Sequence, residues 1–186
     1  GVPTPRIAHA RVWLNGRDLG FYVLKEGFDT QFMRNHFGSK AGTFYDGGFC
    51  ADLDQKKDRK IGSGTNDQAD LKALVAASRE PDLVKRAVLL NQTLAVDHFL
   101  SVIALEMMIA HWDGYARNRN NYRLMNPAGA NKIYFLPSGM DQIFGDPNFP
   151  VFDSMGGLVT GALWQLPQTK NQYRDRVTFL LTNVFT

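Results

Sequence analysis

The chain has 186 residues, of which 44% are hydrophobic and 12% aromatic, enough for a buried core and for one domain, or one and a piece. Its 21 basic and 18 acidic residues leave a formal charge of only +3, without a stripe of interleaved basic and aromatic residues. Nucleic acid is therefore not an expected partner.

Cysteine content and hydropathy exclude further classes. Cys50 is the single cysteine, which excludes an intramolecular disulfide framework and a cysteine-rich zinc site. No apolar window is long enough to span a membrane, so no membrane span is expected. The chain begins with Gly1 rather than Met, which predicts a fragment of a longer protein, so the missing signal peptide says nothing about export.

The first predicted element is a β-hairpin. Small or apolar residues alternate with larger polar ones over residues 7–14, and a second strand returns over residues 19–24. Asn15-Gly16 between them favours the positive φ angles of a tight hairpin turn. A short helix should follow, with Asp29 as its N-cap and Gly38 as its end.

Residues 39–72 are rich in loop formers. A brief strand is expected at 43–45, while the basic run 56–60 is interpreted as a surface feature. The acidic residues between 52 and 58 do not form an EF-hand loop, because Lys56 occupies the third ligand position.

Three helices are expected next, over 70–77, from 81 onward, and over 94–110. The last is apolar nearly all round, which is typical of a buried helix. We therefore interpret Met107 and Met108 as core residues rather than cofactor ligands. His98 should be a satisfied histidine, since no partner His or Cys lies at ligand spacing.

A short motif follows that helix directly. His111, Asp113 and Asn118 have the His-x-Asp-x-x-x-x-Asn spacing of a protein-kinase catalytic loop. In such a loop the Asp accepts the proton of the attacking hydroxyl and the Asn binds Mg²⁺. The alternative is a purely structural turn, because Asp-Gly pairs and Asn clusters are common loop formers.

The order of the next elements agrees with the kinase interpretation. Strands are expected at 122–125 and 132–136, and then comes Asp141 shortly before Phe144-Gly145. In a kinase the catalytic loop is likewise followed by a hairpin and by a metal-binding Asp near Phe-Gly. A helix over 173–185, cut off mid-domain, is expected at the end.

Three stretches carry a family resemblance, namely "NGRDLGFYVLKEGFD", "HWDGYARNRNNYRL" and "KIYFLPSGMDQIFGD". The chain resembles the spore-coat protein H (CotH) kinase family from about Pro3 to the last helix. The resemblance implies a kinase-like fold that binds ATP and Mg²⁺ and phosphorylates Ser or Thr of extracytoplasmic or spore-coat proteins. By position, Asp113 matches the catalytic Asp of the family and Asn118 its metal-binding Asn.

One position departs from the family pattern. The family often has Pro-Trp-Asp-x-Asp before its Phe- or Trp-Gly, whereas this chain has Ser138 and Gly139 in place of Trp and the first Asp. Either Asp141 has taken over as metal ligand, or catalysis is impaired. The impaired form would be a kinase-like surface or coat protein that serves as a binding or structural module.

We therefore predict an α+β, atypical protein-kinase-like fold. Residues 1–27 would form a partial small-lobe hairpin with a hinge, and residues 28–186 a mainly helical large lobe that is incomplete at its C-terminus. The backbone of Lys25, Glu26 and Gly27 would face the adenine, although Glu26 could instead be a solvated strand end. Because the phosphate-covering strands would precede residue 1, this chain alone is expected to bind ATP weakly.

Overall fold

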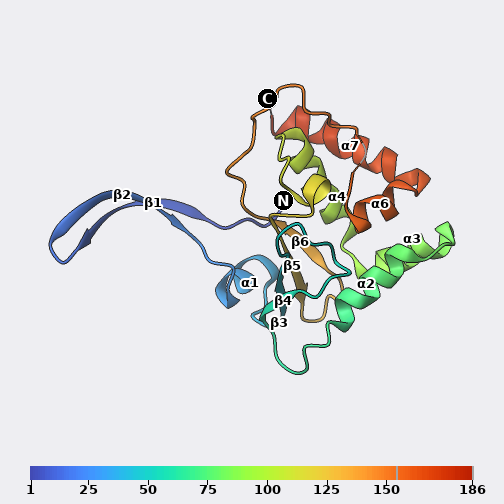
Figure 1. Ribbon diagram of the computed structural model, residues 1–186, viewed down its shortest axis with the longest axis horizontal. Coiled ribbons are helices and arrows are strands. Elements are labelled where there is room, and N and C mark those ends of the chain that lie inside the picture. The colour runs from blue at the N-terminus through green and yellow to red at the C-terminus, as the bar shows by residue number, and fades with distance from the viewer. Residues whose placement is uncertain (154, 186) are drawn as a thin grey trace.

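The structure is a computed structural model that describes residues 1–153 and 155–185, and its architecture is α+β, as predicted (Figure 1). The strands are β1 (Ile7–Leu14), β2 (Arg17–Lys25), β3 (Gly42–Asp46), β4 (Asp58–Ile61), β5 (Tyr122–Pro127) and β6 (Tyr134–Pro137). The helices are α1 (Thr30–Phe37), α2 (Ala69–Arg79), α3 (Leu83–Thr93), α4 (Val96–Met108), α5 (Tyr115–Asn118), α6 (Leu158–Trp164) and α7 (Pro167–Asn183).

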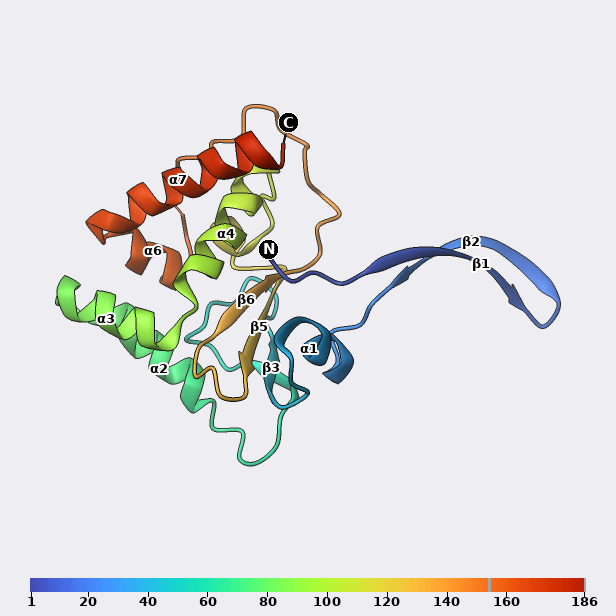
Figure 2. The same ribbon diagram turned by 180° about the vertical axis from the view of Figure 1, so that it is seen from behind.

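The predicted hairpin of β1 and β2 is confirmed. It extends away from the rest of the molecule as a two-stranded ribbon (Figures 1 and 2). Asn15 and Gly16 have φ angles of 51° and 77°, as a two-residue turn of type I′ requires. The ribbon leaves large apolar side chains in solvent, with Phe21 79% and Ile7 63% exposed.

The second sheet has four strands in the order β4-β3-β5-β6. One face is covered by α1, whose Phe32 and Met33 are fully buried against Phe44 and Met125 of the sheet. The predicted ends of α1 are confirmed: the Asp29 carboxylate accepts the first backbone N–H groups, and Gly38 is left-handed with φ of 73°.

The other face of the sheet joins the main hydrophobic core. Leu124 and Phe135 pack there with α4, and α7 in turn packs against α4. The predicted core roles in α4 are confirmed, because Met107 is fully buried and Met108 is partly buried against the core. His98 is satisfied, since its Nε2 lies 2.6 Å from the carbonyl oxygen of Phe135.

Two predictions need correction. The basic run is not a plain surface feature: residues 58–61 form β4, and Lys57 is only 2% exposed. Its Nζ donates to the carbonyls of Gly47 and Ala51, so main-chain oxygens replace the water that a surface lysine would bind. Helix α7 begins at Pro167, well before the predicted start, and α6 was not predicted.

Within residues 1–153 and 155–185, no helix is both long and apolar enough to cross a membrane.

Candidate active site

The loop that carries the kinase-type motif connects α4 to β5 and contains the single turn α5. Asp113 is half-buried in it, and both of its carboxylate oxygens accept amide hydrogens. Oδ1 accepts from Asn118 Nδ2 at 3.0 Å and from Asn120 Nδ2 at 3.1 Å. Oδ2 accepts from Asn120 Nδ2 at 3.1 Å and from Asn121 Nδ2 at 2.8 Å. The predicted pair of Asp113 and Asn118 is thus brought together and held in one orientation.

Asn120 and Asn121 were not among the predicted site residues. Because a carboxylate only accepts hydrogen bonds, each Asn amide turns its nitrogen toward Asp113. The oxygen of Asn118 is therefore left free to bind another group, since no residue that the structure describes donates to it. An amide oxygen with no protein donor is a suitable ligand for a hard cation.

Glu106 lies beneath this loop and is fully buried. Its carboxylate accepts the backbone N–H of Ala116 at 3.0 Å and that of Tyr115 at 3.4 Å. Burial raises the pKa of Glu106 to about 7, and the two hydrogen bonds from the backbone act in the opposite direction. Sequence reasoning missed Glu106, although a lone carboxylate in the apolar second half of a helix was a usable signal.

Gly114 is required by the packing around Glu106. A Cβ at Gly114 would lie 2.7 Å from Glu106 Cδ and 2.8 Å from His111 Cδ2. The Asp-Gly pair is thus more than a turn former, because the loop closes over the buried carboxylate only where no side chain intervenes.

His111 is fully buried next to the same site. Burial lowers its pKa, while the Ser138 backbone and the charges of Asp113 and Asp141 act in the opposite direction. The Ser138 backbone is near the ring, yet neither ring nitrogen makes a hydrogen bond of good geometry with a described residue. Since burial is the larger effect, the neutral imidazole is favoured.

Asp141 lies in a segment that is attached to the loop at both ends. The N–H of Ser138 donates to Asn121 O at 2.9 Å, and the N–H of Phe144 donates to Ile109 O at 2.7 Å. Asp141 itself is exposed, and its charge contributes to the pKa of His111. The two attachments place an accessible carboxylate beside the loop of Asp113.

A metal site here would be sparse in protein ligands. Among the described residues, no three His, Cys, Asp or Glu side chains are grouped to hold a metal ion. Mg²⁺ usually keeps several waters and takes only one or two protein carboxylates together with substrate phosphates. The described residues therefore do not fit a metal cage made of protein alone, and Asn118 and Asp141 would supply only two ligands beside those of a nucleotide.

The segment Lys25-Glu26-Gly27 is at the base of the ribbon. The Glu26 carboxylate accepts from Arg6 Nη2 at 2.7 Å and from Asn35 Nδ2 at 3.0 Å. The Arg6 guanidinium lowers the pKa of Glu26 to about 2, and the Glu26 side chain is only 11% exposed. Glu26 is thus engaged and is not a solvated strand end. The backbone is also partly engaged, since the Glu26 N–H donates to Arg6 O at 2.9 Å and Gly27 O accepts the Asp29 N–H at 3.0 Å. No hydrogen bond or ion pair between described residues joins this segment to Asp113 or Asn118.

Asp52 connects the loop to the rest of the fold. Its Oδ1 accepts the hydroxyl of Tyr115 at 3.0 Å, and its Oδ2 accepts the N–H of Leu158 at 2.7 Å. The Tyr115 hydroxyl in turn accepts the N–H of Val159 at 3.1 Å. These bonds fix α5, α6 and the start of segment 52–58 relative to one another.

A pocket of about 470 Å³ opens beside the loop. Asn120 and Asn121 form part of its wall, so it borders the residues that hold Asp113. Arg123 of β5, which is paired with Asp46 at 3.0 Å, lines it from the sheet, and Lys57 lines it from the residue before β4. Burial lowers the pKa of Lys57 to about 8, against the charges of nearby aspartates.

Together, the fold and the loop define an α+β protein in which Asp113 and Asn118, at the spacing of the kinase-type motif, are hydrogen-bonded to each other. The chain belongs to the CotH family, whose model, described as "CotH kinase protein", matches residues 1–186. It is also 26% identical over 157 residues to the invasin CotH2 of Rhizopus delemar, an alignment that covers 73% of this chain. The chain spans 26% of the length of that relative. The family predicted from three short stretches is therefore confirmed.

Proposed function

We propose that this chain is part of an ATP- and Mg²⁺-dependent protein kinase that transfers the γ-phosphoryl group to Ser or Thr hydroxyls. The observation that carries this proposal is the Asp113 carboxylate, fixed by the amide of Asn118 five residues on, in a loop closed over a buried carboxylate. A structural turn would need neither an accessible amide oxygen nor a second carboxylate beside it.

Each residue has a role in the proposed transfer. Asp113 orients the acceptor hydroxyl and takes its proton as the oxygen attacks the γ-phosphorus and the bond to ADP breaks. Asn118 and Asp141 would hold Mg²⁺, which when bound neutralises charge on the phosphates. The backbone of Lys25, Glu26 and Gly27 would contact the adenine. Most of the rate enhancement would come from positioning and charge stabilisation.

The wider setting follows from the same proposal. Residues 1–27 would be a partial small lobe and residues 28–186 a large lobe of a kinase-like fold. The substrates would be extracytoplasmic, coat or cell-surface proteins. The family membership and the invasin relative support this location.

A second candidate is a kinase-like surface protein without catalysis. Gly139, at the place where the family often has an acidic residue, favours it, because glycine supplies no metal ligand. This module would keep the loop geometry and still lack Mg²⁺-dependent nucleotide binding.

The two candidates differ in a direct assay. The protein is incubated with γ-labelled ATP and mixed protein acceptors, with Mg²⁺ or with a chelator, and its thermal midpoint is recorded in parallel. The kinase proposal predicts label on Ser or Thr and a raised midpoint only when ATP and Mg²⁺ are both present. No label and no shift in midpoint, with protein extended on either side of residues 1–186, would favour the binding module.

A further inference from the structure

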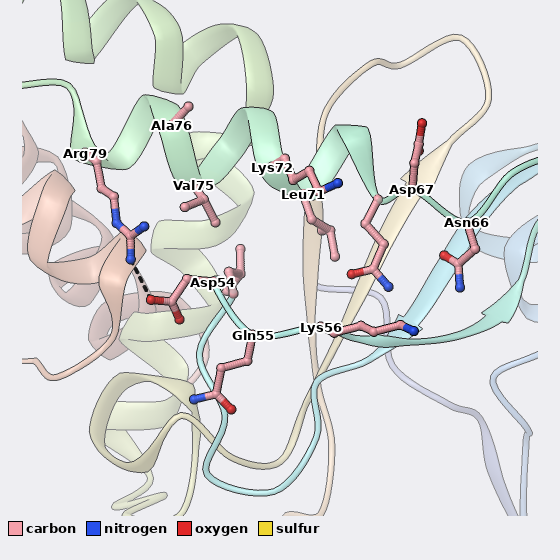
Figure 3. A pocket seen from close by; sticks show the side chains of 12 residues that line it. Asp54, Gln55, Lys56, Asn66, Asp67, Leu71, Lys72, Val75, Ala76 and Arg79 are labelled. Carbon is pink, nitrogen blue, oxygen red and sulfur yellow. Dashed lines mark hydrogen bonds and ion pairs between the residues drawn. The ribbon is translucent and has the colours of Figure 1, made fainter.

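A groove of about 600 Å³ lies between α2 and residues 53–56 (Figure 3), and Asp113 is not among its lining residues. Its floor is apolar: Leu53 and Leu71 are almost completely buried, and Val75 is half-buried above them. This volume is within the range of ligand-binding clefts, and the accessible apolar surface suits one aliphatic side chain.

The charges on the rim of the groove are not balanced. Arg79 and Asp54 neutralise each other, with 2.6 Å between their charged atoms (Figure 3). Asp67 accepts the Ala69 N–H and keeps its negative charge, so three cations stand against two carboxylates on this rim.

Two cations on this rim are not held in an ion pair. Lys56 and Lys72 are exposed, and neither forms an ion pair with any residue that the structure describes. Exposed lysines are common, so the relevant observation is their position: both flank the apolar floor. A ligand that combines an aliphatic group with a carboxylate would satisfy the floor and the rim together.

The groove has one lining residue in common with the pocket beside the candidate active site. Lys56 lines both the groove and the 470 Å³ pocket whose wall includes Asn120 and Asn121. The bond from Tyr115 to Asp52 fixes the start of the intervening segment to the catalytic loop, so the groove keeps its place relative to Asp113.

We propose that the groove docks the acceptor polypeptide, taking an aliphatic side chain over Val75 and an Asp or Glu side chain at Lys56 and Lys72. An extended segment would run from the groove through the adjoining pocket, which brings its Ser or Thr to Asp113. Naming the bound polypeptide as the acceptor rests on the proposed kinase function, whereas the binding itself does not.

Binding can be measured without catalysis. Each fluorescein-labelled peptide contains one Ser and one Leu-Glu pair, and the peptides differ in how many residues separate the pair from the Ser and on which side of the Ser it lies. A matched set has Leu-Lys in place of Leu-Glu. Anisotropy titrations should show tighter binding of Leu-Glu peptides at one spacing, and weaker binding as salt rises. Equal binding of the two sets, or no binding of either, would overturn the proposal.

Matched variants locate the binding on the chain. Lys72→Glu should weaken binding of the best Leu-Glu peptide about three- to tenfold. Lys170→Glu is the control, because Lys170 is exposed and holds the same position in the first turn of α7 as Lys72 does in α2. Equal effects of the two substitutions would show that the contact is non-specific and would overturn the docking site.

A second pair tests the apolar floor. Val75→Asp should abolish the preference for Leu, whereas Val84→Asp, at a position 79% exposed on α3, should not. Circular dichroism checks that both variants fold, and Lys72→Glu remains informative if Val75→Asp does not. Peptide binding without phosphorylation would contradict the kinase proposal alone, and phosphorylation that ignores the Leu-Glu pair would contradict the docking proposal alone.

Discussion

The side-chain oxygen of Asn121 occupies the space that a side chain on Gly139 would need. A Cβ at Gly139 would stand 2.4 Å from Asn121 Oδ1, and the backbone there is left-handed, with φ of 57°. The nitrogen of the same Asn121 amide donates to Asp113. The departure from the family pattern at Gly139 and the orientation of Asp113 are therefore parts of one arrangement.

Restoring an acid at this position should disturb that arrangement. We expect Gly139→Asp to destabilise the fold by about 2 kcal/mol, because it adds a clash and backbone strain. Combining it with Asn121→Ala removes the clash. The double variant should therefore lose about 1 kcal/mol less unfolding free energy than the sum of the two single losses. Denaturant unfolding of the three variants measures this coupling, and simple additivity would mean that the two residues are independent.

Asp141 should matter for Mg²⁺ and not for folding. Because its side chain is exposed, Asp141→Ala should leave the unfolding midpoint within about 0.5 kcal/mol of the parent. It should abolish the Mg²⁺ dependence of nucleotide binding, measured by calorimetric titration with and without the ion. Asp146→Ala, an exposed change in the same loop, is the control. Persistent Mg²⁺ dependence in Asp141→Ala would place the ion elsewhere.

Glu106 should give the protein a pH-dependent stability. Its pKa is raised from 4.5 to about 7 on folding, so the folded state binds more protons than the unfolded state between these values. Stability from this group is therefore fully present below about pH 4.5 and falls as pH rises to 7, by about 3 kcal/mol at most. His111 acts oppositely up to about pH 6.5, since its folded pKa is lowered.

The difference between parent and Glu106→Gln isolates the Glu106 contribution. The free energy of unfolding of the parent minus that of the variant should decline between pH 4.5 and 7. His111 is present in both proteins, so its own titration largely cancels. A difference that stays flat across this range would show that Glu106 does not titrate as described.

The ribbon of β1 and β2 should promote association. Its exposed apolar residues, with Phe21 and Ile7 foremost, and its unpaired strand edges favour pairing with another chain. Sedimentation of the 186-residue chain should show concentration-dependent oligomers, and Phe21→Lys should reduce them. Phe179→Lys, at an exposed position on α7, is the matched control. A monomer at all concentrations would contradict this expectation.

Local signals made part of this structure predictable. The Asn15-Gly16 turn and the Asp29 cap act through neighbouring backbone, so sequence alone located the hairpin and α1. The pairing of Asp113 with Asn118 also depends on one short loop. Each of these features depends on residues that are only a few positions apart in the sequence.

Distant partners explain what sequence analysis missed. Lys57 looked like part of a solvated run, yet the carbonyls of a loop six to ten residues earlier enclose its ammonium group. The close approach of Asn121 to Gly139, which leaves no room for a side chain there, depends on the path of the intervening hairpin. The position of Lys56 in the walls of both the groove and the pocket likewise follows from tertiary packing that no periodicity indicates.

The most direct test of the kinase proposal is phosphoryl transfer by Asp113→Asn. The parent, extended as needed on either side of residues 1–186, should transfer label from γ-labelled ATP to a Ser or Thr acceptor. The variant should be slower by about 10² to 10⁴, because an amide cannot take the proton. The free energy of unfolding of the variant should fall by only about 1 kcal/mol, because the new side-chain N–H would face Asn amides that donate to Asp113 in the parent. Equal rates in parent and variant, or a rate loss that merely follows unfolding, would contradict a catalytic Asp113.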